Sequence, residues 1–200
     1  MIELPDLALP AEAEHRLRDL QTDVDAAAKY VDRVLRAKKL WDTKNNTKAN
    51  KTCFDSVKLK LTEMCRGPRR CAYCEDSLAD EIEHVKPKQL YPELVFAWKN
   101  YLYACGPCNL AKSSHFKVFK AGTDEVLDVG RTRNDPVIPP EVGDPLFIDP
   151  RLEDPMDFMQ IDLLGTFLMV PRGSRGSRQY LRAEFTIQSL KLEEETKRSR

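Results

Sequence analysis

CAYC at residues 71–74 and CGPC at residues 105–108 are two Cys-x-x-Cys motifs separated by 30 residues, 75–104. Each motif can form a turn that presents two sulfurs to one point, so together they can surround a tetrahedral Zn²⁺. The predicted zinc ligands are Cys71, Cys74, Cys105 and Cys108. The separation exceeds the roughly 15 to 20 residues of the commonest arrangement. We therefore expect a structural zinc site with an extra segment inserted between its two halves.

The inserted segment holds the residues best suited to chemistry. Glu83 and His84 are adjacent, and neighbouring side chains on a strand point to opposite faces, so the pair suits a strand end or a bend. Asn109 follows the last cysteine at the start of a predicted helix. Carboxylate and amide oxygens, together with phosphate oxygens, suit a hard divalent cation such as Mg²⁺. The pattern therefore predicts a second, oxygen-lined metal site close to an imidazole.

The apolar pattern predicts a strand at 80–85, a second strand at 100–104 and a closing helix at 108–116. Pro87 prevents the first strand from continuing as a central one. The aromatic residues between the strands favour core filling over a platform for stacked bases. These aromatic residues are Tyr91, Phe96 and Trp98.

The motif residues occur in the order Glu83-His84, Pro87, Asn100, Asn109 directly after the second Cys-x-x-Cys, and Lys112. This order resembles the HNH endonuclease family, whose core is a ββα-metal finger. The resemblance implies that His84 is a general base, that Glu83 and Asn109 hold a catalytic Mg²⁺ or Mn²⁺, and that Asn100 braces the loop. Some of these families carry a third histidine in the closing helix, where this chain has Asn109.

Three lysines near this site could bind the phosphates of DNA, although each is equally compatible with a solvated surface lysine. These lysines are Lys86, Lys88 and Lys112. His115 lies six residues beyond Asn109, too far round a helix to share its face, and is left out of the predicted metal site.

Further motifs between residues 71 and 150 resemble the HNH subunit of Septu anti-phage defence systems and of related retron operons, the PtuB type. They include CAYCE at 71–75, WKNYL at 98–102 and LFIDP at 146–150. The resemblance implies DNA as substrate and a PtuA-type ATPase as partner. Two alternatives stay open: a catalytically silent zinc module that binds nucleic acid or a partner, and an HNH nuclease from restriction or homing.

Composition is consistent with a globular protein of 200 residues that is 42% hydrophobic. Lys plus Arg equals Asp plus Glu at 32 each, so the whole chain carries no positive field. Residues 29–70, however, hold 13 basic and four acidic residues, a net charge of about +9 that suits phosphates. Residues 122–165 hold 11 acidic residues and three arginines.

The beginning of the chain shows no basic-then-apolar signal, and no apolar run approaches the roughly 20 residues that cross a bilayer. We therefore expect a cytoplasmic protein without membrane association. Six cysteines in a reducing compartment favour metal binding over disulfides. Cys53 and Cys65 lie outside the motifs and are expected to be small buried residues.

We expect an α+β fold in three parts: a helical extension at 1–66, the nuclease core at 67–120 and a mixed extension at 121–200. Apolar spacing predicts one long helix at 11–41, packed on the core or free for a partner, then a loop at 42–51 and a helix at 52–65. The C-terminal elements expected are extended pieces at 137–140 and 146–150, a hairpin within 158–170 and a final helix at 179–197.

Overall fold

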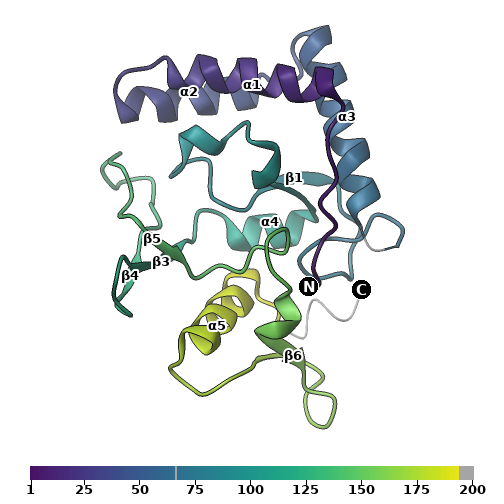
Figure 1. Ribbon diagram of the computed structural model, residues 1–200, viewed down its shortest axis with the longest axis vertical. Helices are drawn as coiled ribbons and strands as arrows, with labels where there is room; N and C mark the ends of the chain where they lie inside the picture. The colour runs from purple at the N-terminus through teal and green to yellow at the C-terminus, as the bar shows by residue number, and fades with distance from the viewer. Residues whose placement is uncertain (66, 194–200) are drawn as a thin grey trace.

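Helices and short strands form a mixed α+β fold in which a small β-hairpin and a helix lie between two sets of outer elements (Figure 1). The computed structural model describes residues 1–65 and 67–193. Three N-terminal helices cover one side of the central elements, and the C-terminal elements cover the opposite side (Figure 1). The predicted α+β class is confirmed.

The prediction of one long helix at 11–41 is wrong, because the chain turns back within that range. Two helices replace it: α1, Ala11–Asp25, and α2, Tyr30–Asp42. They lie side by side, and the Arg36 guanidinium donates to both carboxylate oxygens of Asp23, with a shortest N···O distance of 2.6 Å (Figure 1). The turn lets Ala37 and Trp41 of α2 point into the interior that α1 also covers.

The apolar stripe of α1 is buried inside this chain. Leu17, Leu20 and Val24 are buried, and α1 packs mainly against α3, Lys48–Met64. The stripe is therefore used for internal packing and is not free for a partner. α3 begins at Lys48, within the predicted loop, because the Thr47 hydroxyl accepts a hydrogen bond from the Asn50 amide and caps the helix.

The central hairpin is formed by β1, Glu81–His84, and β2, Tyr101–Ala104, which pair in antiparallel register. Both strands were predicted within a residue or two of these bounds. α4, Gly106–Lys112, follows β2 directly and carries Pro107 in its first turn. The helix ends well before the predicted residue 116, because Ser113 has a left-handed backbone with φ 46°.

Two 3₁₀ turns connect the strands: η1, Pro92–Leu94, and η2, Trp98–Asn100. Phe96 between them is buried, and the Trp98 indole donates to the Leu7 carbonyl at 2.9 Å. Tyr91 packs edge-on against Phe116. The aromatic residues of this segment therefore fill the core, as the sequence favoured.

The C-terminal part contains a three-stranded sheet that the sequence did not predict. Its strands are β3, Lys117–Lys120, β4, Val126–Asp128, and β5, Gly143–Pro145, in the order β4-β3-β5. A side chain at Gly143 would collide with the Phe119 carbonyl, so the close pairing of β5 with β3 requires glycine there. Residues 137–140 form no strand, and Leu146, Phe147 and Ile148 are buried beyond the end of β5.

The predicted hairpin is confirmed as β6, Met159–Ile161, paired with β7, Met169–Pro171. A short 3₁₀ turn, η3, Pro155–Asp157, precedes it. The final helix, α5, spans Arg178–Leu190 and ends where Lys191 has a left-handed backbone with φ 53°. The predicted continuation is therefore wrong at residues 191–193, and residues 194–197 lie outside the described residues.

One buried apolar cluster runs from Met1 to Leu192 and includes residues from all three predicted parts of the chain. The three parts therefore share one interior; residue 66, at the predicted first boundary, lies outside the described residues. Arg151 links two parts, since its guanidinium donates to the carbonyls of Trp98 and Tyr101 at 2.6 and 2.8 Å. Among the described helices, none combines the length and the apolar character needed to cross a bilayer.

Candidate active site and metal centre

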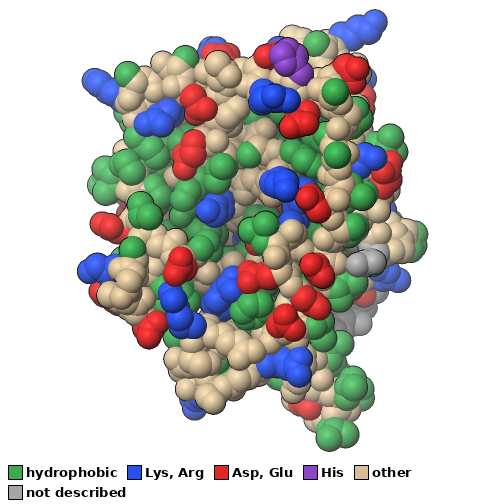
Figure 2. Space-filling view, viewed as in Figure 1, with side chains coloured by type: hydrophobic (Ala, Val, Ile, Leu, Met, Phe, Trp, Pro, Cys, Tyr) green, Lys and Arg blue, Asp and Glu red, His purple; other side chains and the backbone are tan. Residues whose placement is uncertain are grey.

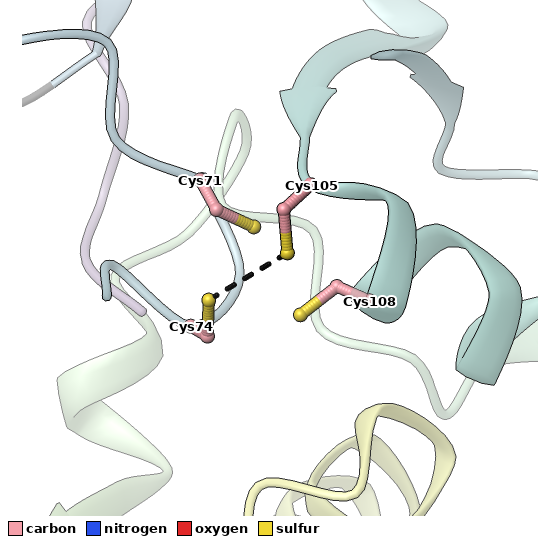
Figure 3. A group of neighbouring side chains, drawn as sticks. All are labelled: Cys71, Cys74, Cys105 and Cys108. Carbon is pink, nitrogen blue, oxygen red and sulfur yellow. Dashed lines mark hydrogen bonds between the residues drawn. The ribbon is translucent and has the colours of Figure 1, made fainter. Parts of the chain in front are cut away.

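The four predicted zinc ligands converge in the structure (Figure 3). Their sulfur atoms all lie within 4.8 Å of one another, and the Cys74 and Cys105 sulfurs are 3.9 Å apart. Tetrahedral Zn²⁺ with Zn–S bonds of about 2.3 Å needs sulfurs roughly 3.8 Å apart. The cysteine cluster could therefore hold a zinc ion with little movement.

The chemistry of the cysteine cluster also fits a metal. Cys71, Cys105 and Cys108 are buried, and Cys74 is partly buried. Hydrogen bonds among the four sulfurs lower the pKa of Cys74 and lower that of Cys105 to about 7, and they raise the pKa of Cys71 and of Cys108. Four thiolates at this distance would repel one another unless a cation lay between them.

The two remaining cysteines lie outside the cluster. Cys53 is buried, its thiol lies 3.4 Å from the Ala13 carbonyl oxygen, and burial raises its pKa to about 11. Cys65 is half-buried, and its thiol donates to the Leu61 carbonyl at 3.3 Å. Both are protonated packing residues, as expected from their position in the sequence.

Next to this cluster lies a cavity of about 510 Å³. It is lined by residues of β1, the loop after β1, and α4: Glu81, Glu83, His84, Pro87, Lys88, Gln89, Gly106, Asn109, Leu110 and Ser113. Glu83, His84 and Asn109, which the sequence placed in one site, thus share one cavity. Asn100, Lys86 and Lys112 do not line it.

His84 is buried and held from three sides. Its Nε2 lies 2.9 Å from the Val95 carbonyl oxygen, and its ring contacts Trp41 and Tyr101 edge-on at centroid distances of 4.3 and 5.1 Å. Because a carbonyl only accepts hydrogen bonds, Nε2 carries the proton and Nδ1 keeps a lone pair. Burial, reinforced by repulsion from Lys88, lowers the pKa of His84 to about 3. The imidazole is therefore neutral at neutral pH and keeps a lone pair on Nδ1, although its burial makes it a weaker base than a solvated histidine.

Glu83 is buried and forms an ion pair with Lys112. The Lys112 Nζ lies 2.7 Å from Glu83 Oε1 and 2.8 Å from the His84 carbonyl oxygen. The Lys112 side chain is fully buried and lies 5.3 Å from the centre of the Phe147 ring. The structure thus places Lys112 inside the protein, away from any phosphate at the surface. It engages Oε1 of Glu83, whose side chain also lines the cavity.

Replacing Lys112 with Met is expected to lower the free energy of unfolding by roughly 3 to 5 kcal/mol, because the Glu83 carboxylate would stay buried without its counter-charge. Denaturant unfolding measures the change. The double variant Glu83→Gln/Lys112→Met leaves no buried charge and should recover much of the loss. Equal stability of Lys112→Met and the unchanged protein would contradict the ion pair.

Asn109 is oriented by Glu81, a residue that the sequence analysis did not single out. The Asn109 Nδ2 donates a hydrogen bond to Glu81 Oε2. A carboxylate only accepts hydrogen bonds, so the contact fixes the amide orientation and directs Oδ1 away from Glu81. Glu81 and Glu83 lie two residues apart on β1, a spacing that puts both carboxylates on one face of the strand. This spacing was the feature of the sequence from which a contribution of Glu81 to the site could have been predicted.

Asn100 acts as a brace. Its Oδ1 accepts from the Lys86 amide at 2.8 Å, and its Nδ2 donates to the carbonyls of Lys86 and Leu94 at 3.0 and 3.1 Å. These bonds hold the chain just beyond β1 against the turn before β2. Asn100 therefore positions the backbone at Lys86 and Leu94. The Lys86 ammonium lies 5.5 Å from the Tyr91 ring centre and borders a different hollow, of about 340 Å³.

Lys88 is the predicted DNA-binding lysine that lines the cavity. Its Nζ lies 5.8 Å from the centre of the Trp41 ring. Charges of both signs are scattered over the face shown in Figure 2, in keeping with the zero net charge of the chain. Any attraction for a polyanion must therefore come from local groups such as Lys88.

The oxygen donors fit a hard divalent cation by their chemistry. Among the described residues, the four cysteines are the only group of three or more His, Cys, Asp or Glu placed to hold a metal. The cavity offers instead the carboxylates of Glu81 and Glu83 and the amide of Asn109. Mg²⁺ commonly uses one or two carboxylates, with water and substrate phosphate completing its coordination. The residues therefore suit a cation that binds together with substrate.

Comparison with known proteins gives a partial relationship. No protein-family model matches the chain, and no solved structure matches it. The chain is similar to the Septu protein PtuB of Bacillus thuringiensis, with 42% identity over 64 residues. The aligned part covers 30% of this chain and 24% of that protein, about a quarter of its length. Over this part, the chain is related to a Septu protein.

Proposed function

We propose that this protein is a metal-dependent HNH endonuclease that hydrolyses DNA phosphodiester bonds within a Septu-type anti-phage defence complex. The observation that carries the proposal is the cavity shared by Glu83, His84 and Asn109, beside a β-hairpin, a helix and a four-cysteine cluster. The partial similarity to a Septu protein supports the defence setting. A PtuA-type ATPase as partner, and a retron-associated setting, belong to the same proposal.

His84 acts as the general base in this proposal. Nδ1 accepts a proton from a water molecule that attacks the phosphorus, and Nε2–H keeps its bond to the Val95 carbonyl throughout. Tyr101 shares that carbonyl, since its hydroxyl donates to the same oxygen at 2.6 Å. The two donors fill both lone pairs of the Val95 oxygen, so the imidazole cannot rotate without losing a buried hydrogen bond.

Glu83 Oε2 and Asn109 Oδ1 would hold a catalytic Mg²⁺ or Mn²⁺. When bound, the cation would stabilise negative charge on the phosphate and on the leaving 3′ oxygen. Lys112 keeps Glu83 in place through Oε1, and Glu81 keeps Asn109 in place through Nδ2. The zinc ion proposed for the cysteine cluster would have all four positions filled by sulfur, so its part is structural.

The test of the proposed function is cleavage by the purified chain. Plasmid DNA is incubated with the protein and Mg²⁺ or Mn²⁺, alone and with a PtuA-type ATPase. Metal-dependent cutting that disappears in a folded Glu83→Gln/Lys112→Met variant, which leaves no unpaired charge at this place, supports the proposal. Absence of cutting under all these conditions, from protein that contains zinc and is folded, would refute it.

One observation favours the second candidate function, a silent zinc module. Both proposed cation ligands already have protein partners, Lys112 for Glu83 and Glu81 for Asn109. A silent module predicts that Cys71→Ser destroys anti-phage protection, whereas Glu83→Gln/Lys112→Met and His84→Ala preserve it. A plaque assay on cells that carry the complete operon separates the two functions.

Replacing Glu81 with Ala is expected to raise the Mg²⁺ or Mn²⁺ concentration for half-maximal cleavage by roughly 10-fold or more, because the Asn109 amide would lose the partner that orients it. Glu81→Gln keeps an acceptor oxygen and serves as the control, with a response close to that of the unchanged protein. A metal titration of cleavage rate measures both. Identical titration curves for Glu81→Ala and the unchanged chain would show that Glu81 does not orient Asn109 for metal binding.

A further inference from the structure

Lysines from three parts of the chain gather around Trp41, whose indole also packs against His84. The Lys44 Nζ, in the α2–α3 loop, lies 4.4 Å from the Trp41 ring centre, and the Lys88 Nζ lies 5.8 Å from it. Lys58 of α3 is close enough to lower the pKa of Lys44 by repulsion. Trp41 is 4.3 Å from the His84 ring, so this group of cations lies next to the proposed base.

The charges of this group are only partly offset by carboxylates: Glu83 attracts Lys88, but its Oε1 is bound to Lys112 at 2.7 Å. Lys44 donates only to a neutral partner, the Trp41 carbonyl oxygen, at 3.4 Å. Within the described part of the chain, no carboxylate lies at ion-pair distance from Lys44, Lys58 or Lys88. Asp42 acts on Lys44 and Lys88 from a distance, but its Oδ2 is bound to Lys38 at 2.6 Å.

Lys44 and Lys88 are also partly removed from water, whereas Lys58 is exposed. Burial lowers the pKa of Lys44, and repulsion from Lys58 and Lys88 lowers it further. Burial likewise lowers the pKa of Lys88. Neighbouring like charges that are half-desolvated repel one another and attract an anion strongly. The arrangement is costly for the free protein and is relieved when negative charge binds.

We infer that Lys44, Lys58 and Lys88 form a phosphate clamp that binds the polynucleotide backbone beside the cavity. The inference deepens the proposed function and rests on it, because the clamp would hold the strand whose phosphate enters the cavity. Trp41 is only 8% exposed, so it supports the lysines and does not stack on bases. Ammonium groups contact phosphates without reading base edges, so binding is independent of sequence and sensitive to salt.

The test measures binding of a fluorescently labelled DNA duplex to the full chain. Fluorescence anisotropy reports the binding at a series of salt concentrations. Mg²⁺ and Mn²⁺ are omitted, so binding is measured apart from cleavage. Each phosphate contact contributes about 0.9 to the slope of log affinity against log salt. The double variant Lys44→Gln/Lys88→Gln should therefore flatten the slope by about 1.8 and weaken binding by on the order of 10- to 100-fold at about 0.1 M salt.

The matched control is Lys99→Gln/Lys120→Gln, which removes the same charge. Lys99 and Lys120 are exposed and already paired, with Asp6 and Glu125. This control should keep the slope of the unchanged protein. Equal slopes for the clamp variant and the control would overturn the clamp. Circular dichroism verifies folding, which the clamp variant should retain because it removes repulsion.

A second readout uses Trp41 itself. The chain has two tryptophans, so Trp98→Phe leaves Trp41 as the single indole. Phosphates that draw Lys44 and Lys88 away from the ring should change its emission during titration with DNA. Saturating DNA without any change in Trp41 emission would contradict binding at this place.

The experiment separates the clamp from the nuclease proposal. Normal binding by the clamp variant, together with cleavage by the unchanged chain, refutes the clamp alone. Clamp-dependent binding without cleavage in Mg²⁺ or Mn²⁺ refutes the nuclease proposal alone. An RNA of equal length is tested in parallel, and clamp-dependent binding to either polymer supports the clamp and identifies the substrate.

Discussion

His84→Ala is expected to slow DNA cleavage by roughly 10²- to 10⁴-fold, the usual contribution of a positioned general base. His84 lines the cavity, and the Val95 carbonyl fixes its proton on Nε2, which leaves Nδ1 as the acceptor. Single-turnover cleavage at saturating protein measures the change in the chemical step. DNA binding in the same variant should stay within a few-fold of normal, because the clamp lysines are intact.

The informative companion is His84→Gln, whose amide can still donate to the Val95 carbonyl. It keeps the buried hydrogen bond but removes the base, so its cleavage should be as slow as that of His84→Ala while its unfolding temperature stays higher. Fast cleavage by His84→Gln would show that the imidazole positions the loop and does not accept the proton.

Loss of the metal from the cysteine cluster is expected to unfold the central hairpin and α4. The sulfurs of the Cys71–Cys74 loop face those of Cys105 and Cys108 at the start of α4, so a bound metal would join the two segments (Figure 3). Apparent zinc-binding free energies in small zinc domains are about 10 to 16 kcal/mol, comparable with the roughly 5 to 15 kcal/mol that stabilise a whole domain. Cys108→Ser should therefore yield protein without zinc and without a cooperative unfolding transition.

Cys65→Ser provides the control for that variant. Its thiol donates to the Leu61 carbonyl, a bond that a serine hydroxyl can replace, and it lies outside the cluster. We expect one zinc per chain and a nearly unchanged unfolding temperature, measured by elemental analysis and circular dichroism. Retention of one zinc by Cys108→Ser with normal unfolding would show that the cluster is not the metal site.

The sequence predicted the centre of the molecule better than its periphery. Two closely spaced cysteine pairs leave few ways to bring four sulfurs together, and the alternation around Glu83 specified the strand. The turn between α1 and α2 could not be predicted, because residues 26–28 are alanines that favour helix. The chain turns there because α2 buries Trp41 in the shared core, which is a tertiary effect.

Two features of the candidate site also depend on tertiary contacts. Lys112 was expected to bind phosphates or to be a solvated surface lysine, yet it is fully buried, with Nζ paired to Glu83 and 5.3 Å from the centre of the Phe147 ring. Glu81 can accept the hydrogen bond from Asn109 only because α4, which carries Asn109, packs beside β1. Long polar side chains have no periodic signature that distinguishes a buried partner from a solvated one.

The packing of His84 against Trp41 bears on how this centre could be transplanted. Trp41 of α2, which packs against the imidazole of His84, lies some forty residues earlier in the chain. The four cysteines and α4 lie much closer to His84 in sequence. A fragment trimmed to residues 67–120 would keep its cysteines but expose the ring to water on that side. An excised finger of this kind would bind zinc without retaining the imidazole in its present orientation, so a graft into another scaffold must carry α2 with it.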